Sequence, residues 1–492
     1  MQNSRKQALR DVFKVAVSNI IALICGILVG FVIPKIMGFD DYGYFKTYSL
    51  YAGYTGLLHF GISDGIFFYF SGADLKTLDK RKIHSLVSFV IALEAIISII
   101  GITVSLFFTS GNPYGLIFIF VFLYSFFSHV QTVLAYVCQA TKQFSFPSLI
   151  SSLKSLADIL AVVVLLVLYK TQDSFVVSFE LYCAVLVSIL AVSSLAFVIK
   201  LWSIVFSKGQ RLDQTRSDIA LMLKLGFPIM IANLTSSLIM TVDKQFVSIF
   251  YPVEASNVFA EFSFAYSVLG LITAVTGAVS MVLFPYMKGK DEKRLCEIFP
   301  HLNAFLVVFV SFACSSYFGI QWIVDKFINK YADSLVYMRV ILPGFIINAS
   351  VTVLMHNYYK TLNKEHVYFW QNIVILFLAV ITDLLAYYFI VLPLDRSNPI
   401  WLTVASDFTL LIWYIVSEGY LVKHYQIKHW KNDLYCIVAS GAFLAVAFFL
   451  NEWMGFVVYF VGITILSLCF YGNDLRAFVA GLSKRKKHKK QD

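Results

Sequence analysis

Charged side chains stand inside several long apolar stretches of this sequence, where an unpaired charge is costly to bury. The most compact case is SLIMTVDKQFVSIFY at residues 237–251, in which Asp243 and Lys244 are adjacent. Adjacent residues on a helix project about 100° apart, so these two cannot form the usual helical ion pair. Lys244 therefore either faces a hydrated cavity or extends its ammonium group toward the edge of the apolar layer.

Other charged residues in apolar stretches each allow two interpretations. Lys154 and Asp158 are four residues apart, hence on one helix face. Either they form a local ion pair, or Lys154 is a cation in a cavity and Asp158 partly offsets its charge. The Arg339 guanidinium either binds a phosphate with two hydrogen bonds or pairs with an acid or a helix C-terminus. Asp383 and Asp407 either bind a proton or Na⁺, or hydrogen-bond to a neighbouring helix. Further polar residues of this kind are Asp64, Glu94, Glu261, His59, His129 and His356.

The composition places these charges in a membrane. The chain has 492 residues, of which 59% are hydrophobic and 14% are charged, and its mean hydropathy is +0.76. A soluble globular protein carries about 25% charged residues. We therefore expect a polytopic membrane protein without a soluble domain, whose intramembrane charges face a cavity or one another.

Apolar runs of about 20 residues recur along the chain, separated by short polar breaks. They predict an all-α fold with about 14 transmembrane helices. The predicted spans are 12–37, 42–70, 84–108, 113–139, 146–169, 175–200, 219–250, 255–286, 299–324, 333–359, 366–391, 399–422, 434–451 and 454–472.

Lys and Arg are distributed unevenly between alternate loops. One set of loops, together with both termini, holds most of them, whereas the opposite set holds only Lys170, Lys326, Lys330 and Arg396. Positively charged loops tend to stay in the cytoplasm, so both termini are expected to be cytoplasmic. The basic tail KRKKHKK is expected to contact anionic lipid rather than nucleic acid.

The cysteines offer no chemistry of their own. None belongs to a Cys-x-x-Cys motif or to a Cys/His ligand cluster, and nearly all lie in or beside apolar runs. We expect no disulfide, no metal and no cofactor. The seven cysteines are Cys25, Cys138, Cys183, Cys296, Cys314, Cys436 and Cys469.

An internal repeat relates two parts of the chain. The segment beginning at Asn19 aligns without gaps with the segment beginning at Asn233, and Asp40 then falls on Glu254. Each copy would hold six helices, an even number, so both copies enter the membrane from one side. The predicted fold is two six-helix lobes related by pseudo-two-fold symmetry around a central cavity, plus two C-terminal helices. The predicted domains are an N-terminal lobe at 1–200, a cytoplasmic linker at 201–218, a C-terminal lobe at 219–422, helices 13 and 14 at 423–472, and a basic cytoplasmic tail at 473–492.

Four stretches carry a resemblance to a known family. They are NIIALICGILVGFVIPKIMGFDDYGYFKTY, LHFGISDGIFFYFSG, LKLGFPIMIANLTSSLIMTVDKQFVSIFY and LFPYMKGKDEKR. With its length and span count, the chain resembles the flippases for O-antigen and capsule precursors. These belong to the multidrug/oligosaccharidyl-lipid/polysaccharide transporter superfamily. The similarity extends over essentially the whole chain, although the motifs are loose.

The resemblance implies a function and a place in the cell. An undecaprenyl-diphosphate-linked oligosaccharide would cross from the cytoplasmic to the outer leaflet of the bacterial inner membrane, its headgroup held in a cationic cavity that opens alternately to each side. Asn19, Asp243 and Lys244 match family-like positions, whereas Lys46, Lys154 and Arg339 are chosen by charge and place alone. The candidate substrate-binding residues are Asn19, Lys46, Lys154, Asn233, Lys244 and Arg339; the candidate ion-coupling residues are Asp158, Asp243, Asp383 and Asp407.

The expected partners are the lipid-linked oligosaccharide, membrane lipids, H⁺ or Na⁺, and glycan polymerase machinery, with no nucleic acid. Two other functions stay open. A cation-coupled multidrug exporter of the same superfamily would favour an acidic, hydrophobic cavity. A membrane-embedded glycan polymerase or glycosyltransferase would need a sizeable outer loop with catalytic residues, and the outer loops here are short. We therefore expect a transporter rather than an enzyme.

Overall fold

The computed structural model describes residues 2–73, 78–109, 112–172, 174–268, 270, 287, 291–394, 396–427 and 430–488, and for 2–13 and 473–488 only the backbone. Its regular elements are helices, which confirms the predicted all-α fold. Outside them, the described residues add one isolated bridge, between Met37 and Val177.

Twelve helical segments of the described chain are long and apolar enough to cross a membrane, so this is a multi-pass membrane protein. The first six are α1 (Gln2–Ile36), α4 (Lys80–Leu106), α5 (Pro113–Ala140), α6 (Ser145–Thr171), α7 (Phe179–Lys200) and α9 (Leu212–Ile239). The other six are α12 (Glu292–Cys314) with α13 (Ser316–Phe327), α14 (Ser334–Ala349) with α15 (His356–Thr361), α16 (Glu365–Ala386) with α17 (Leu392–Leu394), α18 (Ile400–Tyr425), α19 (Trp430–Phe449) and α20 (Glu452–His488).

The predicted span 42–70 consists of two helices. α2 (Phe39–Tyr54) and α3 (Ile62–Phe70) are separated by a single 3₁₀ turn at Thr55–Leu57. Phe60 and Gly61 then adopt φ of 50° and 77°, a left-handed conformation that ends a right-handed helix. The predicted span 255–286 begins as the helix Val258–Val268, and its residues 271–286 lie outside the described chain.

The prediction of a single helix over 219–250 was wrong. α9 begins earlier, at Leu212, and ends at Ile239, and α10 (Val242–Phe250) follows after Thr241. Hydropathy did not reveal this break because both helices and the residues between them are apolar. α10 begins with Asp243 in its first turn, where a carboxylate interacts favourably with the helix dipole.

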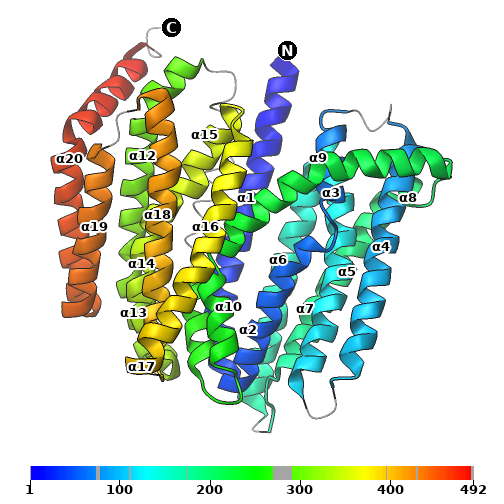
Figure 1. Cartoon of the computed structure of the whole chain (residues 1–492), viewed down its shortest axis with the longest axis horizontal. Helices are drawn as coiled ribbons and strands as arrows, with labels where there is room; N and C mark the ends of the chain where they lie inside the picture. The colour runs from blue at the N-terminus through cyan, green and yellow to red at the C-terminus, as the bar shows by residue number, and fades with distance from the viewer. Residues whose placement is uncertain are drawn as a thin grey trace. The chain divides into compact units, whose positions relative to one another are not determined.

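Packing divides the chain into two compact units, Met1–Leu271 and Ile272–Asp492. Each unit brings together its own set of helices. In the first unit α5 packs against α2, α3, α4 and α7, while α1 packs along α6 (Figure 1). The contacts also group α9 with the first unit, because α9 packs against α3.

The first part of α9 crosses α3 and α4 at a steep angle (Figure 1). A Cβ atom on Gly226 of α9 would collide with the backbone oxygen of Gly61, and one on Gly65 would collide with the backbone of Met222. The two backbones therefore touch, and only glycine fits at this crossing. The Lys82 ammonium group of α4 also pairs with the carboxylate of Asp218 of α9 at 2.8 Å.

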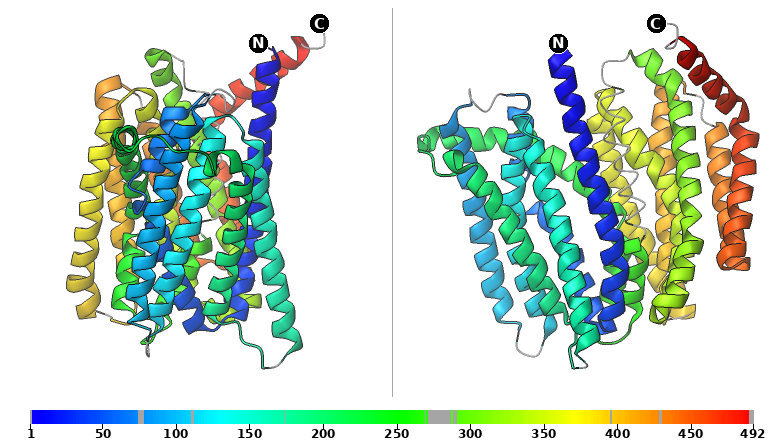
Figure 2. Two further views of the ribbon diagram at one scale, coloured as in Figure 1. Left: turned by 90° about the vertical axis from the view of Figure 1, so that its right-hand side faces the viewer. Right: turned by 180° about the vertical axis from the view of Figure 1, so that it is seen from behind.

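In the second unit, α14 packs against α12, α18 and α19. The helices α19 and α20 run side by side (Figure 2). Buried neutral groups join its helices. Oγ of Ser350 donates to Oδ1 of Asn303 at 2.7 Å, and Nε1 of Trp413 donates to Oδ1 of Asn372 at 2.9 Å. At these two points, buried polar groups of neighbouring helices satisfy each other without a charge.

Candidate cationic site

Two predicted lysines come together in the first unit. Lys46 lies on α2 and Lys244 on α10, and both side chains are half-buried. Their ammonium groups are close enough to repel each other electrostatically. Neither forms an ion pair with a carboxylate of the described residues. Two partly desolvated cations side by side make an attractive place for a multivalent anion.

Aromatic rings hold the first of these cations. Nζ of Lys46 lies 5.0 Å from the ring centroid of Tyr42 and 4.9 Å from that of Phe45. Cation–π contacts of this length offset part of the cost of removing an ammonium group from water. The rings therefore stabilise a charge that has no acidic partner in the described chain.

The two adjacent charges at the start of α10 have different contacts. Asp243 is buried, and its Oδ1 accepts a hydrogen bond from the backbone N–H of Lys244 at 2.7 Å. The hydroxyl of Tyr266 donates to the other carboxylate oxygen, Oδ2. Asp243 is thus fixed at the helix start, and Lys244 lies within electrostatic reach of both Asp243 and Lys46.

Polar and aromatic side chains continue from the lysines. Nε2 of Gln245, the residue after Lys244, donates to the hydroxyl of Tyr51 at 3.3 Å. The ring of Tyr51 in turn lies 5.0 Å from the ring of Phe118 on α5. Tyr51 therefore contacts both the residue that follows Lys244 and an aromatic side chain of α5.

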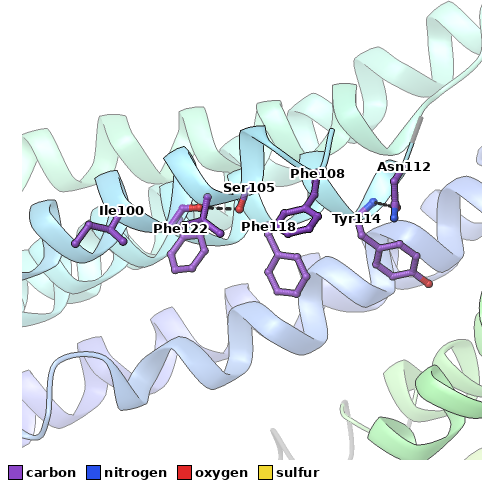
Figure 3. A pocket seen from close by; sticks show the side chains of 10 residues that line it. Ile100, Ser105, Phe108, Asn112, Tyr114, Phe118 and Phe122 are labelled. Atoms are coloured by element: carbon purple, nitrogen blue, oxygen red, sulfur yellow. Dashed lines mark hydrogen bonds between the residues drawn. The ribbon is translucent and has the colours of Figure 1, made fainter. Parts of the chain in front are cut away.

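Phe118 also lines an apolar pocket of about 560 Å³ between α4 and α5. Figure 3 shows Tyr114, Phe118 and Phe122 of α5 in one row with Ile100 and Phe108 of the preceding segment. The pocket walls are almost entirely hydrocarbon, so the pocket suits an acyl or isoprenoid chain. Phe118 therefore both contacts Tyr51 and lines the pocket.

Lys154 and Asp158, both on α6, are half-buried and within electrostatic reach of each other. Oδ1 of Asp158 is buried and receives no hydrogen bond from the described residues. Asp158 also lies within electrostatic reach of Tyr182, whose ring is 4.9 Å from that of Phe45. These residues therefore border the aromatic residues around Lys46 rather than joining the lysine pair.

The two predicted asparagines are not brought into this cluster by any described contact. Asn19 is half-buried on α1, next to Ser18, whose hydroxyl donates to the Ser148 backbone oxygen of α6 at 2.9 Å. Asn233 is exposed on α9. Their predicted role in substrate binding stays a prediction.

The remaining predicted residues belong to the second unit. Nε of Arg339 donates to the Tyr317 hydroxyl of α13 at 2.6 Å, and its guanidinium carbon lies 5.7 Å from the Phe448 ring centroid of α19. Asp383 is buried on α16, and Asp407 of α18 lies against Gly344 of α14. Arg339 therefore contacts α13 and α19, and its predicted phosphate contact stays a prediction.

Sequence reasoning did not single out Tyr51, Phe118 or the pocket. Tyr51 and Phe118 are aromatic residues among many in apolar helices, so their types carry no signal. Their importance comes only from the packing of α2 against α5 and α10.

The fold is shared with known transporters. No protein-family model matches this chain, and no curated protein sequence matches it. A solved structure described as lipid II flippase MurJ in an inward closed conformation superposes with a TM-score of 0.70 at 13% identity, covering 94% of this chain and 99% of that one. An inward-facing multidrug resistance MATE family transporter of the MOP superfamily gives a TM-score of 0.55 at 14% identity, covering 82% of this chain and 98% of that one.

At these identities the likeness concerns the fold alone. The transporter fold that the family resemblance implied is therefore confirmed over nearly the whole chain. The likeness in fold does not distinguish an O-antigen flippase from other transporters with this fold.

Proposed function

We propose that this protein is a flippase that moves an undecaprenyl-diphosphate-linked oligosaccharide across the bacterial inner membrane, with both termini in the cytoplasm. The observation that carries the proposal is the Lys46–Lys244 pair, which lies in the same unit as an apolar pocket. Tyr51 contacts both Gln245, the residue after Lys244, and Phe118 of the pocket lining. One end of this site suits an anion and the other a hydrocarbon chain.

The chemistry of the cargo fits the two ends. A diphosphate cannot enter hydrocarbon alone, because moving its charge out of water is costly. Lys46 and Lys244, neither of which forms an ion pair with a carboxylate of the described residues, supply the compensating charge. Lys–phosphate hydrogen bonds are stronger than neutral ones. Tyr51 and Gln245 offer hydroxyl and amide groups for the sugars, and aromatic faces for their C–H surfaces.

The apolar pocket gives the lipid its place. A polyprenyl chain needs no hydrogen bonds, and the pocket between α4 and α5 offers almost none. A cation-coupled multidrug exporter would favour an acidic cavity, whereas the acid nearest this pair, Asp243, has both oxygens hydrogen-bonded. The lysine pair therefore favours an anionic cargo.

Reconstitution tests the proposal. Purified protein in liposomes would be given undecaprenyl diphosphate carrying a fluorescent NBD group on its head, and dithionite would then quench the probe exposed on the outer leaflet. We expect the protein to make the inner-leaflet probe accessible, and an NBD-labelled neutral undecaprenol to stay protected. Equal movement of both probes, or of neither, would contradict a flippase that recognises the diphosphate.

A further inference from the structure

A buried polar cluster in the first unit lies apart from the lysine pair. The side chain of Glu94 on α4 is 0% exposed, and its Oε2 lies 2.8 Å from Nδ1 of His129 on α5. The hydroxyl of Ser125 donates to the same oxygen at 3.3 Å. Within the described chain, no group donates a hydrogen bond to Oε1 of Glu94. One added proton at this carboxyl group would remove its charge and with it the cost of that bare oxygen.

The cluster continues through His59 to Asp64. The rings of His59 and His129 lie 5.0 Å apart and nearly perpendicular, at 86°. Nε2 of His59 is 3.8 Å from Oδ2 of Asp64. Side-chain exposure rises along this series, from 0% at Glu94 and 5% at His129 to 9% at His59 and 13% at Asp64. The four groups therefore form a graded path from the interior of the unit outward.

His59 occupies the break between α2 and α3. Its Nδ1 accepts a hydrogen bond from the backbone N–H of Gly61 at 3.0 Å, so the neutral ring carries its proton on Nε2. A second proton must go to Nδ1, which would remove the acceptor from Gly61. Gly61 lies directly against Gly226 of α9. The charge of His59 therefore acts on the break and on its contact with α9.

The groups that surround this path limit where a proton can reside. Tyr136 of α5 lies within electrostatic reach of Asp64. α9 meets the break through Gly226 and Met222, which do not titrate. His59 and His129 interact electrostatically, so a positive charge on one ring opposes a positive charge on the other. One proton shared between the two histidines is thus favoured over one on each.

A purely structural role does not require this charge. In the second unit, the neutral pair Asn303 and Ser350 joins α12 to the π-helix Ser350–Met355 that follows α14, with one 2.7 Å hydrogen bond between buried side chains. A buried ion pair contributes little stability over such neutral contacts because desolvation of both charges offsets their attraction. The acid and histidine of the first unit are therefore better explained by proton binding.

We propose that this cluster is a proton-binding switch with two positions. In the first, the proton lies between Glu94 and His129, and neutral His59 accepts from Gly61. In the second, the proton lies on His59 opposite Asp64, and the N–H of Gly61 has lost its acceptor. The proton enters from hydronium, whose O–H bond breaks as an N–H bond forms at Nδ1 of His59 and leaves water. The positive ring then faces Asp64 through its Nε2–H. Transfer inward breaks the Nδ1–H bond as a bond to the Glu94–His129 pair forms.

The switch links protons to the movement of α3 against α9. A role in driving transport rests on the proposed flippase function, whereas proton binding itself does not. The experiments below use no lipid-linked cargo, so their failure would be separate from a failure of the proposed function.

Histidine titration tests proton sharing. The side-chain ¹⁵N shifts of the full-length protein in nanodiscs would be followed from pH 5 to pH 8, with signals assigned through His59→Gln and His129→Gln. We expect removal of either histidine to move the titration midpoint of the other by at least about half a pH unit. Glu94→Gln should move the midpoint of His129 as well.

A matched control lies in the second unit, where Glu418 is also a buried carboxylate, 3% exposed. Glu418→Gln should leave both histidine midpoints unchanged. Independent titration of the two histidines, or no titration of either in this range, would overturn the proposal.

Hydrogen exchange tests the link to the helix break. After correction for the intrinsic pH dependence, we expect the amide of Gly61 to lose about tenfold protection on acidification from pH 8 to pH 5. In His59→Gln the protection should no longer depend on pH, while the melting temperature stays near that of the parent. Unaltered pH dependence in this variant would refute the switch.

Discussion

Asp243 and Lys244 carry opposite charges side by side in the chain, and at the start of α10 they have different contacts. Asp243 is held by the backbone N–H of Lys244 and by the hydroxyl of Tyr266. Lys244 is left to share a half-buried space with Lys46. Two like charges held together repel, so an anion bound between them gains both attraction and relief of that repulsion.

This geometry predicts the effect of removing either lysine. A hydrogen bond to a charged group contributes about 1.5–3 kcal/mol, so Lys46→Ala or Lys244→Ala should weaken binding of undecaprenyl diphosphate about tenfold or more. The double variant should lose less binding free energy than the two single variants added together. Each single variant already loses the relief of the repulsion between the lysines, and the double variant loses that relief only once. Binding would be measured with the fluorescent probe in nanodiscs.

Lys224→Ala provides the matched control, because Lys224 is exposed on α9 and lies outside the cluster. It should bind the probe like the parent protein. Parent-like affinity in both lysine variants, with normal folding, would count against a diphosphate site at this pair.

Tyr51 allows a second test at this scale. Tyr51→Phe removes the hydrogen bond from Gln245 but keeps the ring against Phe118, so the effect should be about 1 kcal/mol or less. Tyr51→Ala also removes the wall that joins the lysines to the pocket, and should weaken binding of the lipid probe more than that of inorganic pyrophosphate. Equal losses for both ligands would show that Tyr51 does not connect the two parts.

At the scale of elements, two broken helices create the site. The break between α2 and α3 brings His59 and Gly61 to α9, and the break between α9 and α10 places Asp243 at a helix start. The α3–α9 crossing depends on Gly61, Gly65 and Gly226, because a side chain at any of them would strike backbone.

We expect Gly226→Leu to destabilise the protein by about 3 kcal/mol or more, since the backbone of Gly61 cannot give way as a side chain can. Thermal unfolding in detergent, together with abundance in the membrane, would measure this. Gly30→Ala is the control: the space beside Gly30 in α1 is open, and alanine favours a helix by about 0.5–1 kcal/mol. A Gly226→Leu protein that melts like Gly30→Ala would contradict the close crossing.

At the scale of the whole molecule, the chain forms two compact units, each with its own buried polar contacts. The lysine pair, the apolar pocket and the histidine cluster all belong to the first unit. Arg339, Asp383 and Asp407 belong to the second, so the predicted cationic and acidic residues are divided between the units. Their joint action in one transport cycle stays a prediction.

Reporter fusions test the predicted orientation of the chain. Alkaline phosphatase fused after Arg396 should be active, because that loop is expected outside, whereas phosphatase fused after the C-terminal tail should be inactive. A green fluorescent protein at the C-terminus should fluoresce. An active phosphatase at the tail would show an odd number of crossings and would overturn the expected topology.

Sequence alone was sufficient for the features that depend on local hydropathy and on the distribution of charge along the chain. Hydropathy over windows of about 20 residues predicts helices that cross a membrane, and the distribution of Lys and Arg predicts their orientation. The intramembrane charges were visible for the same reason, because each stands out against its own neighbours. Both broken spans were missed, since an apolar segment reads alike whether it is one helix or two.

Only the tertiary structure decided which of these residues meet. Lys46 and Lys244 are far apart in the chain, as are His59 and His129, and their proximity follows from how α2, α5, α9 and α10 pack. The crossing of α3 and α9 depends on a backbone contact between Gly61 and Gly226, and the residue type of a glycine does not indicate which residue it will contact. Local composition sets the cost of burying each charge, but only the contact between distant helices determines which neighbours offset that cost.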